Sequence, residues 1–127
     1  MKRILTIDDE EDLTFFIKAN LELTGEYEVT VARSGKEGIK AAIRSKPDII
    51  LLDIMMPHMD GYQVLDRLKK SRKTLSIPVI MLTAKGDDES KMKASSLYNE
   101  DYIVKPIQID SLITKIEEVL KRGTITS

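Results

Sequence analysis

The stretch Asp48-Ile49-Ile50-Leu51-Leu52-Asp53-Ile54-Met55-Met56-Pro57 decides the fold class of this chain. A short run of branched apolar residues that ends at a proline is typical of a strand buried on both of its faces. Burial on both faces predicts a parallel sheet with helices above and below it. Asp53 interrupts the run, and a charged residue inside a buried strand needs a structural or functional reason.

Shorter apolar runs of the same kind recur on both sides of this strand. We expect strands near 3–8, 27–32, 48–53, 78–83 and 101–104. Strands that alternate regularly with helical patterns predict an α/β fold, in which a doubly wound, five-stranded parallel sheet carries helices on both faces. The length of 127 residues favours one domain, which we place at residues 1–122, followed by a short C-terminal tail at 123–127.

Helical patterns fill the intervals between the expected strands. We expect helices near 10–24, from Ser34 to before Pro47, from about Gly61, near 87–97 and near 109–121. The first has an inward stripe of Leu13, Phe16, Ile17 and Leu21 and ends at Gly25. The last begins at the expected cap Asp110. The helix near 87–97 has little apolar stripe, so we expect it to be the least anchored.

Polar residues finish four of the expected strands. The first strand ends at Asp8 and Asp9, the third at Asp53 and the fourth at Thr83, and the fifth runs into Lys105. In the strand order 2-1-3-4-5 these ends lie side by side at the edge where parallel sheets bind ligands. Three carboxylates about 5 Å apart repel by roughly 3 kcal/mol per pair at an effective dielectric constant of about 20. They therefore require a cation, and an oxygen-only ligand set favours Mg²⁺.

This set of residues is suited to phosphoryl transfer. A metal ion, a lysine and a hydroxyl stabilise the oxygens of a phosphoryl group, while Asp53 can attack phosphorus as a carboxylate nucleophile. The hypothesis is an aspartyl phosphate at Asp53. The alternative is purely structural: Asp8 and Asp9 cap the first helix, and Asp53 caps a turn. In this reading Thr83 satisfies backbone groups and Lys105 is solvated.

The motifs resemble the receiver domain of two-component response regulators, the family that includes the chemotaxis regulator of flagellar motors. The resemblance spans essentially the whole chain. It rests on Ile7-Asp8-Asp9-Glu10, on the stretch 48–57 with Met59-Asp60-Gly61, on Pro78-Val79-Ile80-Met81-Leu82-Thr83-Ala84 and on Asp101-Tyr102-Ile103-Val104-Lys105-Pro106. It implies a flavodoxin-like sheet of order 2-1-3-4-5.

The resemblance also implies a mechanism at Asp53. This residue would accept a phosphoryl group from the phosphohistidine of a sensor histidine kinase, or from a small donor such as acetyl phosphate. Asp9 and Asp53 would bind Mg²⁺ directly, with Asp8 acting mainly through water and the backbone carbonyl of Met55 completing the protein ligands. The chain would catalyse only its own phosphotransfer and dephosphorylation.

Two further roles follow from the same resemblance. Thr83 and Lys105 would bind phosphoryl oxygens, and Thr83 and Tyr102 would form a switch pair, in which the hydroxyl moves toward the phosphoryl group and the ring turns inward. The switch would act on a downstream protein, on a missing output domain or through a phosphorylation-dependent homodimer. A small Mg²⁺-dependent phosphohydrolase, a phosphorelay intermediate that serves a histidine phosphotransfer protein, and an FMN binder remain as alternatives.

Composition narrows the partners and the compartment. With 20 Lys and Arg against 21 Asp and Glu, the formal net charge is −1, so no strong field gathers nucleic acid or anionic lipid. The apolar stretch at 49–56 is too short to span a membrane. The sequence has no cysteine and its N-terminus becomes acidic too early for a signal peptide. We therefore expect a cytoplasmic protein that binds neither nucleic acid nor membrane through this chain.

Overall fold

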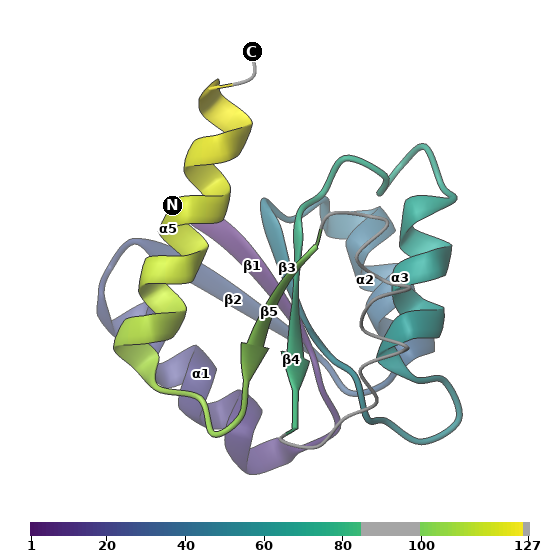
Figure 1. The fold of residues 1–127 in the computed structure, drawn as a ribbon, viewed down its shortest axis with the longest axis horizontal. Coiled ribbons are helices and arrows are strands. Elements are labelled where there is room, and N and C mark those ends of the chain that lie inside the picture. Colours follow the sequence, from purple (N-terminus) through teal and green to yellow (C-terminus); the bar gives the residue numbers. More distant parts are fainter. Residues whose placement is uncertain (85–99, 126–127) are drawn as a thin grey trace.

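The computed structural model describes residues 1–84 and 100–125, with side chains up to residue 122 (Figure 1). The elements are β1 (Lys2–Ile7), α1 (Glu11–Leu23), β2 (Tyr27–Ala32), α2 (Gly35–Ser45), β3 (Ile49–Asp53), α3 (Gly61–Lys69), β4 (Val79–Thr83), β5 (Asp101–Val104) and α5 (Ile109–Ile125). Every expected strand is confirmed, with ends that differ by at most one residue. The helix expected near 87–97 lies outside the described residues.

The five strands form one parallel sheet in the order β2-β1-β3-β4-β5. The order confirms the prediction and brings the carboxyl ends of β1, β3, β4 and β5 to one edge. Ile7 pairs with Leu52, Asp53 with Leu82, and Thr83 with Val104. The polar residues that finish these strands therefore lie in adjacent positions.

Helices cover both faces of the sheet. α1 and α5 lie on one face and α2 and α3 on the other (Figure 1). One core joins α2 and α3 to the sheet through residues such as Ala42, Val64 and Leu65, and the other joins α1 and α5 through Ile17 and Leu112. All five residues of β3 are buried, as a strand between two helical layers requires.

The inward face of α1 differs from the expected stripe. Ile17 and Leu21 are buried as predicted, but Phe16 is 40% exposed and Leu13 is only half-buried. Thr14 takes the buried position, because its hydroxyl donates to the Glu11 carbonyl. The prediction for Phe16 was wrong because Thr14, whose hydroxyl is satisfied within its own helix, can face the sheet. The helix is therefore rotated so that its buried face is not the face with the most apolar residues.

The ends of α5 also differ from the prediction. The amide of Leu112 donates to the carbonyl of Gln108, so the helix begins at Ile109 and Asp110 lies inside the first turn. Asp110 is therefore not the cap, although an acidic residue in a first turn still favours the helix dipole. The helix continues to Ile125 and takes in part of the expected tail.

An ion pair on α1 covers the outer edge of the sheet. β2 is an edge strand, and the bonds from Lys2 to Glu26 and from Asp8 to Ala32 show that its even-numbered residues face β1. The odd-numbered Val29 therefore directs its peptide groups outward. There the Val29 amide donates to Glu22 Oε2 at 3.0 Å, and Lys18 Nζ donates to the Val29 carbonyl at 2.6 Å.

A second ion pair, this one buried, joins α3 to the start of β5. Lys69 Nζ lies 2.6 Å from Glu100 Oε1, and the two side chains are only 10% and 5% exposed. The other Glu100 oxygen accepts a hydrogen bond from the amide of Val79, the first residue of β4. The pair thus holds three elements together at the end of the sheet opposite Asp53. Among the described residues no helix is both long and apolar enough to cross a bilayer.

Candidate functional site

Asp8, Asp53 and Lys105 meet at the carboxyl edge of the sheet, as the sequence predicts. Lys105 Nζ lies 3.0 Å from Asp53 Oδ1 and 3.6 Å from Asp8 Oδ2. Asp8 and Asp53 are buried, and the Lys105 side chain is 17% exposed. The lysine therefore lies between the carboxylate edge and solvent, with its charge directed inward.

Glu10 is a member of the site that sequence reasoning missed. Its Oε1 lies 2.9 Å from Lys105 Nζ, and Asp8, Glu10 and Asp53 each offer one oxygen within 4.8 Å of the others. Asp9, predicted as a direct metal ligand, is exposed and is not one of these three. The signal for Glu10 was its place directly after the two aspartates, where α1 begins.

Burial controls the electrostatics of the carboxylates. It raises the pKa of Asp53 to about 6, against the opposing hydrogen bond from Lys105 and with a further rise caused by the negative charge of Asp8. Burial likewise raises the pKa of Asp8. For Lys105 burial favours the neutral form, but hydrogen bonds to Glu10 and Asp53 outweigh it and raise the pKa. The lysine is thus firmly cationic.

Two carboxylate oxygens in the site find no hydrogen-bond donor among the residues that the structure describes. Asp8 Oδ2 and Asp53 Oδ2 are fully buried and have no hydrogen-bond partner within residues 1–84 and 100–125. A buried carboxylate oxygen without a hydrogen bond destabilises the folded protein. Such oxygens are good ligands for a hard divalent cation. The donor chemistry therefore fits Mg²⁺, as the sequence predicts.

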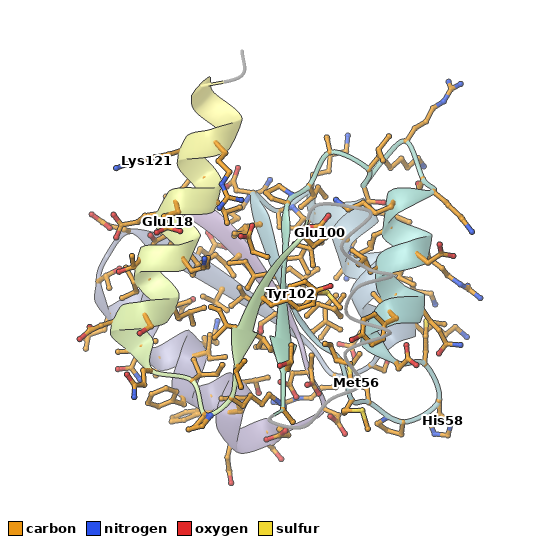
Figure 2. All side chains as sticks on the ribbon, viewed as in Figure 1. Met56, His58, Glu100, Tyr102, Glu118 and Lys121 are labelled. Carbon is orange, nitrogen blue, oxygen red and sulfur yellow. The ribbon has the colours of Figure 1, made fainter. Side chains whose placement is uncertain are left out.

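Neighbouring strands position the remaining site residues. Thr83 is buried at the end of β4, and its carbonyl accepts a hydrogen bond from the amide of Lys105 at 2.6 Å. Tyr102 is half-buried on β5, opposite Met81 in the strand register, and packs against the core on the α3 side (Figure 2). Thr83 and Tyr102 thus lie on the adjacent strands β4 and β5, and Lys105 directly follows β5.

Gly61 brings the start of α3 directly against the end of β3. Its amide donates to the carbonyl of Ile54 at 2.8 Å. A Cβ atom at this position would lie 2.5 Å from the carbonyl oxygen of Asp53 and 2.7 Å from Ile54 Cα. Glycine is required because only a hydrogen fits between the helix and the strand that carries Asp53.

The loop between β3 and α3 borders the site. The Met55 side chain is 66% exposed, and its carbonyl remains a predicted metal ligand. His58, the single histidine of the chain, is exposed in the turn with a φ of 69°, which agrees with a loop residue rather than a general base (Figure 2). Lys85, which is next to the site in sequence, lies outside the described residues.

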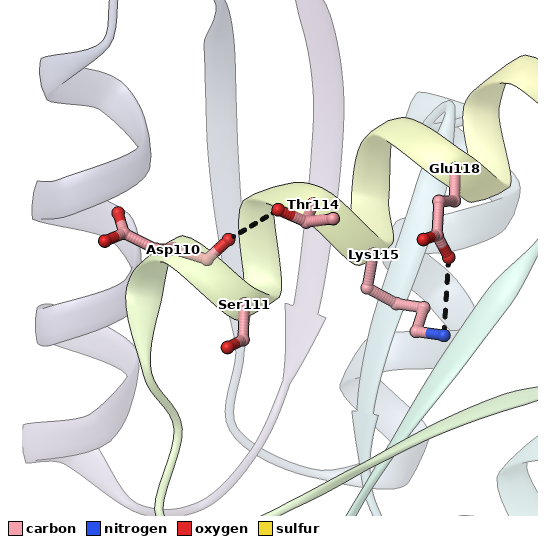
Figure 3. A pocket seen from close by; sticks show the side chains of 5 residues that line it. All are labelled: Asp110, Ser111, Thr114, Lys115 and Glu118. Atoms are coloured by element: carbon pink, nitrogen blue, oxygen red, sulfur yellow. Dashed lines mark hydrogen bonds and ion pairs between the residues drawn. The ribbon is translucent and has the colours of Figure 1, made fainter.

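Two surface hollows differ in their relation to the site. One of about 460 Å³ opens beside Lys105, and its described lining is Glu10, Leu13, Ala84, Lys105, Pro106 and Ile107. The other, of about 310 Å³, has its described lining on α5 alone, where Thr114 donates to the Asp110 carbonyl and Lys115 pairs with Glu118 at 3.5 Å (Figure 3). Of these two hollows, the first is the one lined by site residues, Glu10 and Lys105.

The parallel sheet with helices on both faces defines a doubly wound α/β fold with buried aspartates and a lysine at its carboxyl edge, and comparison with known proteins specifies the family. The family model described as "Response regulator receiver domain" matches residues 4–117. The chain belongs to this family.

Similar proteins support the assignment. The DNA-binding dual master transcriptional regulator RpaA of Synechocystis sp. is 37% identical over 122 residues, which cover 96% of this chain and 50% of that protein. The alkaline phosphatase synthesis transcriptional regulatory protein PhoP of Bacillus subtilis is 36% identical, over 99% of this chain and 51% of its own length. The chain thus spans about half the length of these curated relatives.

A solved structure shows the same fold. The response regulator receiver domain protein (CheY-like) from Methanospirillum hungatei JF-1 is 30% identical and superposes with a TM-score of 0.91, covering 100% of this chain and 99% of that one. The architecture predicted from the sequence is thus confirmed both by the strand order and by this similarity.

Proposed function

We propose that the chain is a phosphorylatable switch of a two-component system, with Asp53 as the phosphoryl acceptor. The observation that carries the proposal is the buried Asp53 carboxylate, which has one oxygen 3.0 Å from Lys105 and the other without a hydrogen-bond partner in the described part of the chain. The donor would be the phosphohistidine of a sensor histidine kinase or of a histidine phosphotransfer protein, or a small acyl phosphate.

The transfer uses Asp53 as a nucleophile. A carboxylate oxygen of Asp53 forms the new bond to phosphorus while the bond from phosphorus to the imidazole nitrogen or acyl oxygen of the donor breaks, and the leaving group keeps the electron pair. Lys105 then donates a hydrogen bond to a phosphoryl oxygen, and the Thr83 hydroxyl donates another. The hollow beside Lys105 supplies the access route for the donor.

Magnesium completes the proposed site. Asp53 and Asp9 would hold Mg²⁺ directly, with Asp8 acting mainly through water and the Met55 carbonyl as a further ligand. When bound, the ion neutralises charge on the phosphoryl oxygens. The unpartnered oxygens of Asp8 and Asp53 support this part of the proposal.

Thr83 and Tyr102 are the proposed switch pair. Their strands β4 and β5 are hydrogen-bonded neighbours, and Thr83 pairs with Val104, two residues beyond Tyr102. Attraction of the Thr83 hydroxyl toward a new dianionic group would vacate space behind it, and the Tyr102 ring would turn inward. A two-state element near the site then changes population because its states bind that charge differently.

The output lies in another protein, in a further domain or in a phosphorylation-dependent homodimer. The relatives RpaA and PhoP are named as transcriptional regulators and are about twice as long as the matched region. In this proposal the present chain works in the cytoplasm, contacts neither DNA nor membrane, and catalyses only its own phosphotransfer and dephosphorylation.

Intact-protein mass spectrometry after incubation with acetyl phosphate tests the proposal. We expect one phosphoryl adduct that requires Mg²⁺, is absent from Asp53→Ala and persists in Asp48→Asn, a control just before the other end of the same strand. An adduct that survives in Asp53→Ala, or no adduct in the wild type, contradicts the proposal. Release of many equivalents of phosphate per chain would favour a phosphohydrolase instead.

A further inference from the structure

Glu10 places a third carboxylate at the site that the transfer to Asp53 does not require. Its oxygen is the closest of the three to Lys105, at 2.9 Å compared with 3.0 Å for Asp53 and 3.6 Å for Asp8. An ammonium group binds carboxylate and phosphoryl oxygens at the same short distances. A carboxylate therefore already fills an anion position beside Lys105.

We propose that Glu10 is a displaceable stand-in for the phosphoryl group: it holds Lys105 in the resting protein and must leave when Asp53 is phosphorylated, so that Glu10 sets the rate of phosphorylation. The inference rests on the proposed function of Asp53. It makes Glu10 a positioning residue that acts through Lys105.

Exposure distinguishes Glu10 from the other two carboxylates. Asp8 and Asp53 are fixed in the interior, whereas the Glu10 side chain is 58% exposed. Its carboxylate makes no capping hydrogen bond to α1, although the residue occupies the N-cap position. Because the Glu10 end of the pair is exposed, its carboxylate can move into water, which replaces the lost hydrogen bond, while Lys105 keeps its bond to Asp53.

Two effects of Glu10 slow the entry of a phosphoryl donor. Its negative charge repels the anionic donor at the mouth of the hollow that Glu10 and Lys105 line together. Its hydrogen bond also occupies a Lys105 proton that the phosphoryl oxygens need. Removal of the charge abolishes the repulsion and weakens the hydrogen bond to Lys105, whereas a merely structural role for Glu10 would predict slower phosphorylation.

The kinetic test compares Glu10→Gln with Glu11→Gln at saturating Mg²⁺ and limiting acetyl phosphate. Glu11 is the adjacent exposed residue, so the control removes the same charge in the first turn of α1. We expect the rate of adduct formation to rise about 3- to 10-fold in Glu10→Gln and less than 2-fold in Glu11→Gln. A tenfold rise corresponds to a barrier lower by about 1.4 kcal/mol. Equal rates in the two variants, or a slower Glu10→Gln, overturn the inference.

A second measurement needs neither metal nor phosphate. Nitrogen-detected NMR of the Lys105 ammonium group reports how fast its protons exchange with water. In Mg²⁺-free protein we expect faster exchange in Glu10→Gln than in the wild type and no change in Glu11→Gln. Unchanged exchange in Glu10→Gln would show that Glu10 does not hold Lys105.

The two proposals fail in distinguishable ways. A wild type that acquires no adduct at Asp53 overturns the proposed function and this inference with it. A wild type that acquires the adduct, with a Glu10→Gln variant no faster than the control, overturns the role of Glu10 alone.

Discussion

Asp53 combines burial with an ionisable group, and this combination links folding to pH. Its pKa in the folded protein is raised by burial to about 6, above the ordinary value of 3.8. Between these two values the folded protein binds a proton that the unfolded chain releases. The contribution of Asp53 to the stability of the metal-free protein is therefore largest at low pH and is lost as the pH rises through about 6.

Asp53→Asn removes this dependence. At pH 7.5 without divalent ions we expect the variant to be more stable than the wild type by on the order of 1 to 3 kcal/mol, since a tenfold change in proton affinity is worth about 1.4 kcal/mol. Urea unfolding at several pH values from 4.5 to 7.5 measures the difference. Glu28→Gln, an exposed carboxylate on β2, is the control and should follow the wild type. Parallel curves for Asp53→Asn and wild type would mean that the carboxylate is not buried.

Gly61 offers a second test at the scale of one residue. Glycine to alanine at a helix start would ordinarily stabilise a protein by about 0.5 to 1 kcal/mol. Here the added Cβ would meet the backbone of Asp53 and Ile54, so we expect Gly61→Ala to lose about 1 to 3 kcal/mol instead. Thermal or urea unfolding gives the sign, and a gain in stability would contradict the close contact of α3 with β3.

The site residues were predictable to different extents. Asp53 and Lys105 stand out because a charge in or directly after an apolar strand is unusual, and the strand order brings them together. Glu10 was not predictable as a partner of Lys105, because in sequence it reads as one acidic residue among several at a helix start. Its contact depends on the direction of a side chain, which the pattern of residue types does not contain.

At the scale of elements, the Lys69–Glu100 pair joins a helix to two strands. Both side chains are nearly buried, and Lys69 also donates to the carbonyls of Leu75 and Ile77. We expect Lys69→Met to destabilise the protein by about 3 to 5 kcal/mol, because it leaves a buried carboxylate without its cation. Urea unfolding measures the loss.

A neighbouring lysine provides the matched control for this prediction. Lys70→Met removes a lysine from the exposed ion pair with Asp66, where the two side chains are 72% and 43% exposed. We expect a change within about 1 kcal/mol. Similar losses in Lys69→Met and Lys70→Met would contradict the importance of burial at Glu100.

Helix phase was the least predictable property of the elements. Strand positions follow from apolar runs that end at turn residues, but the rotation of α1 depends on Thr14, whose hydroxyl bonds within its own helix and accepts from Arg33. The start of α5 similarly depends on the backbone bond between Leu112 and Gln108. None of these three bonds has a signature in the residue pattern.

At the scale of the molecule, the strand order was predicted from the resemblance to receiver domains, and the polar strand ends agree with it. The observed order makes β1, β3, β4 and β5 successive neighbours, which brings Asp8, Asp53, Thr83 and Lys105 together at one edge. The predicted strand order and the predicted site residues were therefore consistent with each other. The identities of the cognate kinase and of the output partner were not predictable in this way, because no second pattern in the chain bears on them.

Magnesium should stabilise the whole domain, because it binds the folded state at carboxylates that otherwise repel each other. At a concentration about 100 times the dissociation constant, the gain is about 2.7 kcal/mol, which corresponds to a rise in Tm of roughly 5 to 10 °C. Thermal melts of wild type and Asp53→Asn with and without Mg²⁺ measure it. A shift of equal size in both proteins would place the ion elsewhere.

The ion pair at the edge of β2 has a consequence for how the protein behaves when concentrated. A sheet grows when another strand bonds to outward-facing peptide groups at its edge. At the middle of β2, Lys18 and Glu22 already bond both peptide groups of Val29. A strand approaching from solvent must first break these two charge-assisted bonds, so the ion pair disfavours strand addition at the middle of the β2 edge.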